Sequence, residues 1–174
     1  MKNAFKEFTV PRSLCGMALC LAMGVILKCF VSIYITPELE LSLVFLPFSL
    51  AGMLYGPAAG FFVGGLTDLL GFFIKPTGPY FPGFTLTAAL TGLVFGLLLY
   101  RLKSELWRVA VAKTVINVFL NLALNTLWLT VLMNKGFWAM LPSRVIKNLA
   151  LLVPEILLTW GIINPIAQIM KKSS

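Results

Sequence analysis

Six ionisable residues lie inside otherwise apolar stretches of this sequence, and they are the residues most able to do chemistry. They are Lys28, Asp68, Lys113, Arg144, Lys147 and Glu155. A charge at the centre of a bilayer costs at least about 2.5 to 3.5 kcal/mol, so such residues usually face a bundle interior or a wet cavity and have partners. Snorkelling to the interface is the alternative for Lys113, near the start of its segment, and for Lys28 and Arg144, toward the outer ends of theirs. Since cations outnumber anions in this set, it predicts a site for an anionic ligand.

Amide side chains repeat at helical spacing close to these charges. Asn117, Asn121 and Asn125 are four residues apart, which places them on one stripe of a helix. A second stripe consists of Arg144, Asn148 and Glu155, with Lys147 beside it. The two stripes can bond to each other between helices or line a polar cavity. We favour the cavity, because mutual pairing leaves basic groups without enough acids.

A loop rich in proline and aromatic residues separates two apolar segments. Residues 75–84 read Lys-Pro-Thr-Gly-Pro-Tyr-Phe-Pro-Gly-Phe. Proline fixes φ and glycine permits turns closed to other residues, so the loop can hold a shape of its own. It suits a lid, in which Tyr80, Phe81 and Phe84 supply aromatic cover. The alternative for Tyr80 and Phe81 is anchoring at the membrane interface.

Residue usage also argues against several kinds of site. Histidine is absent, and Cys15, Cys20 and Cys29 all lie in the first apolar segment. We therefore expect no metal site, no cofactor and no histidine-based catalysis. An intramembrane enzyme with Asp68 and Glu155 as an acid–base pair is disfavoured for the same reason.

The composition places these residues in a membrane protein. Of 174 residues, 59% are hydrophobic and 11% charged, whereas soluble domains are roughly a quarter charged. Each span needs about 20 apolar residues, and six apolar segments are present. They cover about 12–34, 41–55, 58–74, 84–100, 109–133 and 141–170. The sequence thus predicts an all-α, polytopic protein: a compact bundle of six transmembrane helices in a single domain, 1–174. Pro47 should bend or break the second segment, and Pro154, Gly161 or Pro165 should divide the last, unless its end lies along the interface.

Basic residues predict the orientation in the cell membrane. Eight lie in the connections on one side of such a bundle: Lys2, Lys6, Arg12, Arg101, Lys103, Arg108, Lys171 and Lys172. The opposite connections hold Lys75 and Lys135 and an acidic turn, Thr36-Pro37-Glu38-Leu39-Glu40. The positive-inside rule puts both termini in the cytoplasm. The net charge of +8 follows from this bias, so it does not indicate a nucleic-acid partner.

Several motifs resemble those of a transport family. They are Ala18-xxx-Ala22, residues 64–70 (Gly-Gly-Leu-Thr-Asp-Leu-Leu), residues 78–85 (Gly-Pro-Tyr-Phe-Pro-Gly-Phe-Thr) and residues 143–148 (Ser-Arg-Val-Ile-Lys-Asn). Over essentially its whole length the chain resembles the substrate-binding S component of energy-coupling factor (ECF) vitamin transporters, and most of all the folate-specific one.

The resemblance implies a function and partners. An S component binds its vitamin from outside, topples in the membrane to deliver it, and works with a transmembrane coupling protein and two ATPase subunits, which hydrolyse ATP. Ala18 and Ala22 match the family's contact with the coupling protein. For folate, Arg144 and Lys147 suit the carboxylates, while Asp68, Asn121, Asn125 or Asn148 suit the pterin edge; Lys28 also belongs to the expected site. Another vitamin, or a membrane scaffold that transports nothing, remains the alternative.

Overall fold

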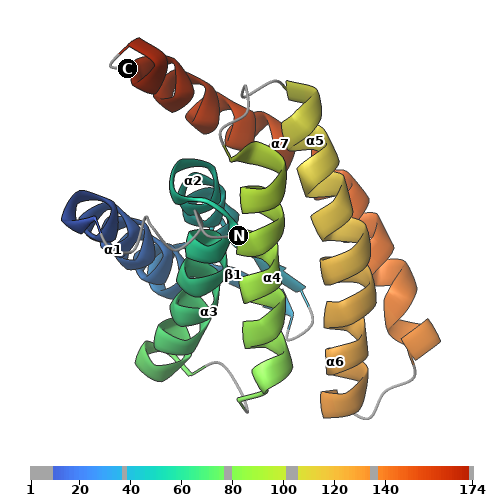
Figure 1. Cartoon of the computed structure of the whole chain (residues 1–174). Coiled ribbons are helices and arrows are strands. Elements are labelled where there is room, and N and C mark those ends of the chain that lie inside the picture. The colour runs from blue at the N-terminus through green and yellow to red at the C-terminus, as the bar shows by residue number, and fades with distance from the viewer. Residues whose placement is uncertain (1–9, 37–38, 77–79, 101–105, 134–136, 173–174) are drawn as a thin grey trace.

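The described part of the chain folds into six helical segments, some of them continued by π-helical turns (Figure 1). The computed structural model describes residues 10–36, 39–76, 80–100, 106–133 and 137–172. Its helices are α1 (Pro11–Ile26) with the π-helix η2 (Leu27–Val31), α2 (Phe45–Tyr55), α3 (Pro57–Ile74), α4 (Pro82–Leu99), α5 (Leu106–Val115) with the π-helix η3 (Ile116–Leu124) and α6 (Asn125–Met133), and α7 (Phe137–Lys172). The predicted six-helix, all-α bundle is confirmed in outline.

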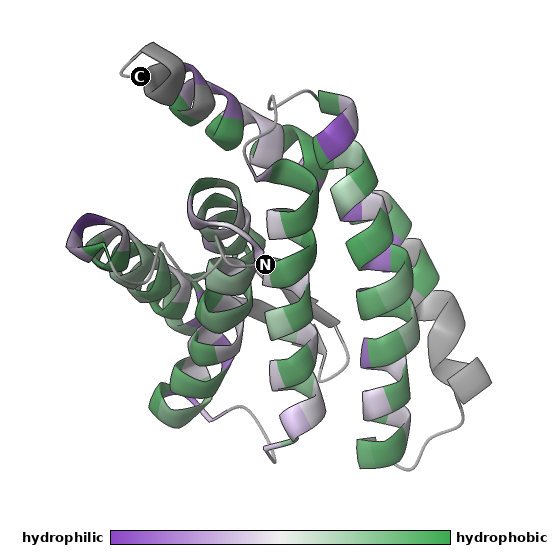
Figure 2. Cartoon of the chain, viewed as in Figure 1, coloured by the Kyte–Doolittle hydropathy of each residue, from purple (hydrophilic) through white to green (hydrophobic). Residues whose placement is uncertain are grey.

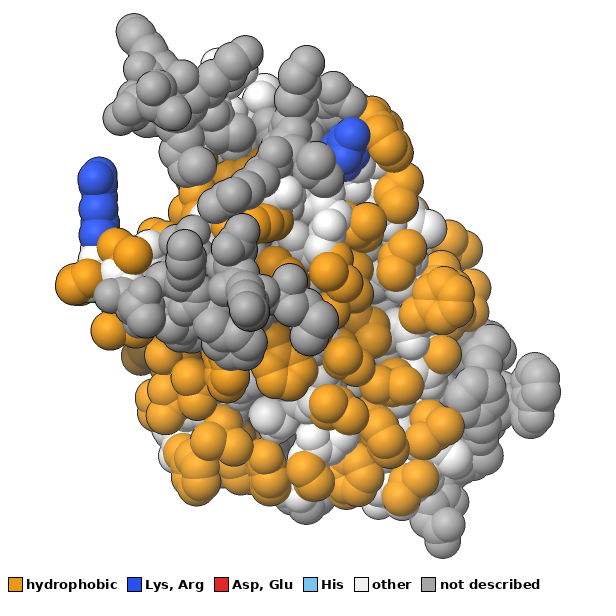
Figure 3. All heavy atoms as spheres, in the orientation of Figure 1, with side chains coloured by type: hydrophobic (Ala, Val, Ile, Leu, Met, Phe, Trp, Pro, Cys, Tyr) orange, Lys and Arg blue, Asp and Glu red, His pale blue; other side chains and the backbone are white. Residues whose placement is uncertain are grey.

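Four of these segments are long and apolar enough to cross a membrane. They are Pro11–Val31, Pro57–Ile74, Pro82–Leu99 and Leu106–Leu132. The shorter apolar helix Phe45–Tyr55 and the apolar stretch Leu151–Ile166 of α7 accompany them. Hydrophobic residues run along the length of the helices in Figure 2. Large apolar side chains such as Phe30 (82% exposed) and Phe73 (74% exposed) are exposed on the surface of the bundle. Hydrophobic side chains likewise predominate over the described part of the face in Figure 3. Such a surface suits lipid.

The first apolar segment ends differently from the prediction. Its helix stops at Val31, and a strand β1 (Ile33–Thr36) pairs antiparallel with β2 (Leu39–Leu41). The Ile-Tyr-Ile-Thr run explains the change, since β-branched and aromatic residues favour strands. The expected acidic turn is therefore part of a hairpin, and its residues Pro37 and Glu38 lie outside the described part of the chain.

Two proline predictions are also corrected. Pro47 is the third residue of α2, where its missing N–H has no helical acceptor, so it does not break the helix. Pro154, Gly161 and Pro165 lie within α7, which continues unbroken from Phe137 to Lys172, so they do not divide it. The alternative, that the end of this segment lies along the membrane interface, stays a prediction. Instead of ending, α7 changes direction: its first half lies beside α5 and α6, and its last half turns away (Figure 1). Contacts with α2 and the buried Ile163 hold the second half.

Glycine lets α2, α3 and α4 touch backbone to backbone. A Cβ added to Gly52 of α2 would lie 2.6 Å from the backbone nitrogen of Gly96 of α4. Gly60 of α3 and Gly92 of α4 meet in the same way, each against the other's carbonyl oxygen. Because any side chain here would force the helices apart, these contacts make α2–α4 a closely fitted frame. The predicted turn at Gly56-Pro57, where Gly56 has φ 93°, leads into it.

Candidate ligand-binding site

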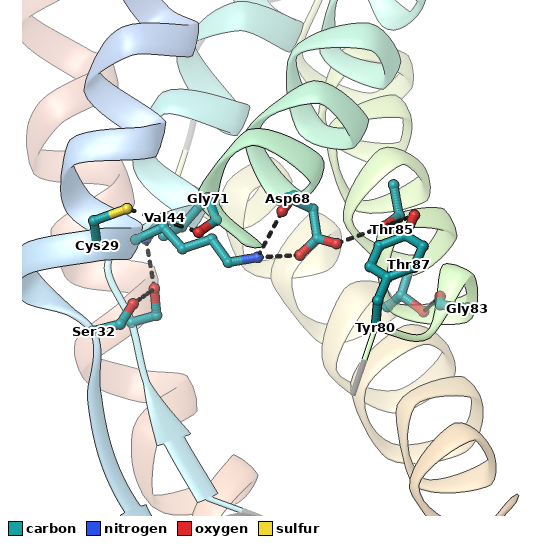
Figure 4. Close-up of polar contacts among 11 residues, drawn as sticks. Cys29, Ser32, Val44, Asp68, Gly71, Tyr80, Gly83, Thr85 and Thr87 are labelled. Carbon is teal, nitrogen blue, oxygen red and sulfur yellow. Dashed lines mark hydrogen bonds and ion pairs between the residues drawn. The ribbon is translucent and has the colours of Figure 1, made fainter. Parts of the chain in front are cut away.

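A chain of polar contacts joins three helical segments near the end of α3 (Figure 4). Lys28 of η2 forms an ion pair with Oδ1 of Asp68 of α3, and its Nζ lies 3.3 Å from the Asp68 carbonyl oxygen. Thr85 of α4 donates a hydrogen bond of 2.7 Å to Oδ2 of Asp68. The hydroxyl of Tyr80 lies 3.1 Å from that of Thr85. Both carboxylate oxygens of Asp68 are therefore engaged, and the loop residue Tyr80 is linked through it to η2.

The local backbone explains how Lys28 reaches Asp68. A Cβ at Gly71 would lie 2.6 Å from Cδ of Lys28, so glycine provides the space for the lysine stem. In the opposite direction, Lys75, at the end of α3, donates a hydrogen bond of 2.9 Å to the carbonyl of Cys29 in η2. Two lysines thus tie the ends of α1–η2 and α3 together.

An aromatic cluster lies beside this polar chain. The ring of Phe81 is 5.9 Å from that of Phe84 and 5.5 Å from that of Trp128, centroid to centroid. Trp128 of α6 donates from Nε1 to Oγ1 of Thr87 of α4 at 3.2 Å. Gly83 brings the backbone against the indole, since an added Cβ would lie 2.6 Å from its Cδ2. Sequence analysis did not select Trp128, although it follows Asn125 by three residues and so lies close to the amide stripe.

The amide stripe follows η3 into α6. Asn121 donates from Nδ2 to Oδ1 of Asn117 at 2.8 Å, and Asn117 is only 5% exposed. Two buried atoms of the stripe, Nδ2 of Asn117 and Oδ1 of Asn125, have no hydrogen-bond partner among the described residues. π-Helical segments are rare and frequently occur at functional sites. The stripe therefore holds one buried donor and one buried acceptor that a ligand can satisfy.

A second buried ion pair lies one turn before the stripe. Nζ of Lys113 is 2.9 Å from Oε2 of Glu155 of α7 and 3.3 Å from the ring centroid of Phe45 of α2. Because its side chain is only 3% exposed, Lys113 does not snorkel. With Asp68 and Glu155 both paired, the surplus cations predicted within the spans are Arg144 and Lys147. Both belong to α7, but their side chains lie outside the described part of the chain.

The structure brings most of the predicted residues into one region. Thr85 of α4 belongs to the polar chain of Lys28, Asp68 and Tyr80. Thr87 of the same helix bonds to Trp128 of the aromatic cluster. Asn121 and Asn125 lie in the same helical segment as Trp128, on η3 and at the start of α6. Asn148 of α7 is half-buried, and no interaction of its side chain is described. Ala18 and Ala22 lie elsewhere, exposed on α1. Among the described residues no three metal-binding side chains gather.

A family model described as "ECF transporter, substrate-specific component" matches residues 12–169. The chain belongs to this family. Since it is a family of transporter components, this S component is a multi-pass membrane protein and not an enzyme. The family predicted from the motifs is thereby confirmed, and the scaffold alternative is set aside.

Known relatives of this S component narrow the comparison. It is 33% identical over 145 residues to the folate transporter FolT of Clostridium novyi (strain NT), covering 83% of this chain and 84% of that protein. It is 28% identical over 172 residues to FolT of Leuconostoc mesenteroides subsp. mesenteroides, covering 94% and 93%. A solved structure, "Crystal structure of FolT bound with folic acid", superimposes with a TM-score of 0.83 at 30% identity, covering 88% of this chain and 93% of that one.

Proposed function

We propose that this S component binds folate at the outer side of the cell membrane and delivers it to the cytoplasm. The observation that carries this proposal is the likeness, over almost the entire chain, to a FolT structure bound with folic acid. Because the match covers both sequence and fold, it favours folate over another vitamin, which remains the alternative.

The side chains of the candidate site support a ligand with folate's chemistry. Folate has a flat pterin and a glutamyl tail with two carboxylates. Phe81, Phe84 and Trp128 offer aromatic surfaces for a flat ring, and the amides of Asn121 and Asn125 offer hydrogen bonds to its edge. Arg144 and Lys147 are the cations proposed for the tail, since guanidinium and ammonium groups bind carboxylates by charge-assisted hydrogen bonds. The proposed site also includes Lys28, Asp68, Tyr80 and Asn148.

Asp68 and Lys28 have a more specific part in this proposal. Each is already paired with the other, so neither presents an uncompensated charge to the ligand. Asp68 also accepts from Thr85, which is in contact with Tyr80. We therefore propose that this pair fixes the position of Tyr80 and of the loop that covers the site, in addition to any direct contact with folate.

Delivery requires partners and an orientation. The ends of α3 and α6 and the starts of α4 and α7 lie at one end of the bundle, opposite the end of α4 and the start of α5 (Figure 1). We assign the first end to the outside and both termini to the cytoplasm, because the basic residues concentrate in the connections of the second end. Ala18 and Ala22, exposed on α1, are the proposed contact with a transmembrane coupling protein, and two ATPase subunits supply the energy. Residues 1–174 act as a single six-helix membrane domain.

Folate titration of the detergent-purified chain, followed by tryptophan fluorescence, tests this proposal. Trp128 lies in the aromatic cluster, so saturable quenching by folate is expected, and Trp128→Phe should remove most of it. Trp160→Phe is the matched control, because Trp160 packs against the core from α7 and should leave the signal in place. Saturation with thiamine or riboflavin and none with folate would refute folate as the ligand.

A further inference from the structure

Asn117 has a buried amide and does not belong to the proposed folate site described above. Asn117 lies at the deep end of the amide stripe and is 5% exposed, and its Nδ2 has no partner among the described residues. Buried polar groups in proteins are nearly always hydrogen-bonded, and leaving one unpaired costs its full desolvation penalty. Such a donor can bond to water or to a ligand, and a ligand that takes this place must offer it an acceptor.

The neighbouring amide determines which kind of group that partner presents. Oδ1 of Asn117 accepts the hydrogen bond from Nδ2 of Asn121 at 2.8 Å, so the end of the Asn117 amide that remains is its N–H donor. At the other end of the stripe, the buried atom without a partner is an acceptor, Oδ1 of Asn125. A carboxylate has acceptors alone and cannot satisfy Asn125. Asn117 and Asn125 lie eight residues apart on the stripe, so they would meet different atoms of one elongated ligand, an acceptor at Asn117 and a donor at Asn125. With the carboxylates of folate assigned to Arg144 and Lys147, the acceptor left for Asn117 belongs to the pterin.

We propose that Asn117 is a specificity-determining residue that donates a hydrogen bond to the 4-oxo oxygen of the pterin ring. This proposal rests on folate being the ligand. The oxo oxygen projects from the ring and can reach a recessed donor. A 4-amino group at the same place is itself a donor, so it could not accept the hydrogen bond from Asn117. A site built to hydrogen-bond one group rejects an analogue that cannot make the bond far more strongly than an apolar pocket rejects a change in size.

Two ligands and three variants test the proposal. The ligands are folate and its 4-amino analogue, aminopterin, titrated against the full chain in detergent by tryptophan fluorescence. The unmodified protein should bind folate at least 10-fold more tightly than the analogue. Asn117→Leu keeps the volume but removes the donor, so that ratio should fall to within about threefold of unity. Asn117→Asp offers an acceptor and should reverse the preference.

Asn164→Asp is the matched control. Asn164 of α7 also accepts a hydrogen bond at Oδ1 from an amide four residues later, Gln168, but it is not part of the proposed site, so its variant should keep the folate preference. Equal affinity of the unmodified protein for both ligands, or an unchanged ratio in Asn117→Leu, would overturn the proposal. If one Asn117 variant does not fold, the ratio in the other decides. Absence of folate binding by the unmodified protein would instead refute the proposed function.

Discussion

The ion pair of Lys113 and Glu155 gives the sharpest test of how the second half of the bundle is attached to the first. Lys113 of α5 contacts Glu155 of α7 at 2.9 Å and places its ammonium 3.3 Å from the ring centroid of Phe45 of α2. The charge of this one side chain therefore meets two other helices. Neither charged residue belongs to the proposed folate site, so stability and binding can be separated.

The different burial of the two side chains predicts that Glu155→Gln and Lys113→Met lower the free energy of unfolding by different amounts. Removing one partner of a buried pair typically costs about 3–5 kcal/mol, because it leaves an uncompensated charge. Glu155→Gln should lie at the upper end of that range, since it isolates Lys113, whose side chain is 3% exposed. Lys113→Met should cost less, because Glu155 is 22% exposed and methionine still packs on Phe45. Removing both charges in Lys113→Met/Glu155→Gln should recover at least about 2 kcal/mol relative to Glu155→Gln.

SDS-induced unfolding of the detergent-solubilised protein measures these free energies. The folded fraction of each variant should bind folate within threefold of the unmodified affinity, which is equivalent to about 0.6 kcal/mol. Thr114→Val is a control for substitution at the next position, because Thr114 is exposed and bonds to the carbonyl of Ala110. If Glu155→Gln is as stable as the unmodified protein, or if the double variant is as unstable as Glu155→Gln, the pair does not stabilise the bundle as described.

Four further predictions concern the site and the partner surface. Gly71→Ala should displace the Lys28 stem and weaken folate binding several-fold. Its control is Gly161→Ala, where an added Cβ meets nothing within 4 Å, and which should bind folate normally. Equal affinities of the two variants would show that Gly71 does not contribute to the site. Arg144→Ala should weaken binding by at least about 1.5 kcal/mol and Arg144→Lys should recover only part, because the bidentate fork is lost; isothermal titration measures both, and an unchanged Arg144→Ala removes the residue from the site. Ala18→Trp should abolish cellular uptake but leave binding to the purified protein intact, and Leu19→Trp, one residue away, is its control; lost binding in Ala18→Trp would contradict this assignment. Replacing Tyr80 and Phe81 by alanine should raise the folate off-rate in stopped-flow measurements with a smaller change in on-rate; an unchanged off-rate would show that the loop is not a lid.

The sequence predicted those parts of the fold that local chemistry determines. The six apolar stretches predict the six helical segments, of which four in the described part of the chain are long enough to cross a membrane. Gly56-Pro57 marks a turn by its own backbone preferences. The spacing of Asn117, Asn121 and Asn125 gives their common stripe without knowledge of any neighbour.

Contacts between helices were less predictable, because they depend on how each helix is rotated and shifted against the next. Lys28 and Asp68 are 40 residues apart, and their pairing depends on the space left by Gly71. Both residues were recognised as important, but their mutual neutralisation was not. Trp128 was missed for a similar reason, since its position beside Phe81 depends on Gly83 and Thr87 of another helix.

The two halves of the bundle are held by different kinds of contact, and the candidate site lies between them. Helices α2, α3 and α4 meet through glycine backbones, so no rotamer change can loosen them. By contrast, α5 and α6 are fastened to that frame by side chains, with Trp128 on Thr87 at one end and Lys113 on Phe45 at the other. A contact between side chains can be kept through a small shift of a helix, because the side chains can adjust their torsion angles, whereas directly packed backbones cannot. The amide stripe lies between these two fastenings, on the side that can adjust. A ligand that bonds to the amide stripe would therefore contact the helices that are held by side chains, and not the backbone-packed frame of α2–α4.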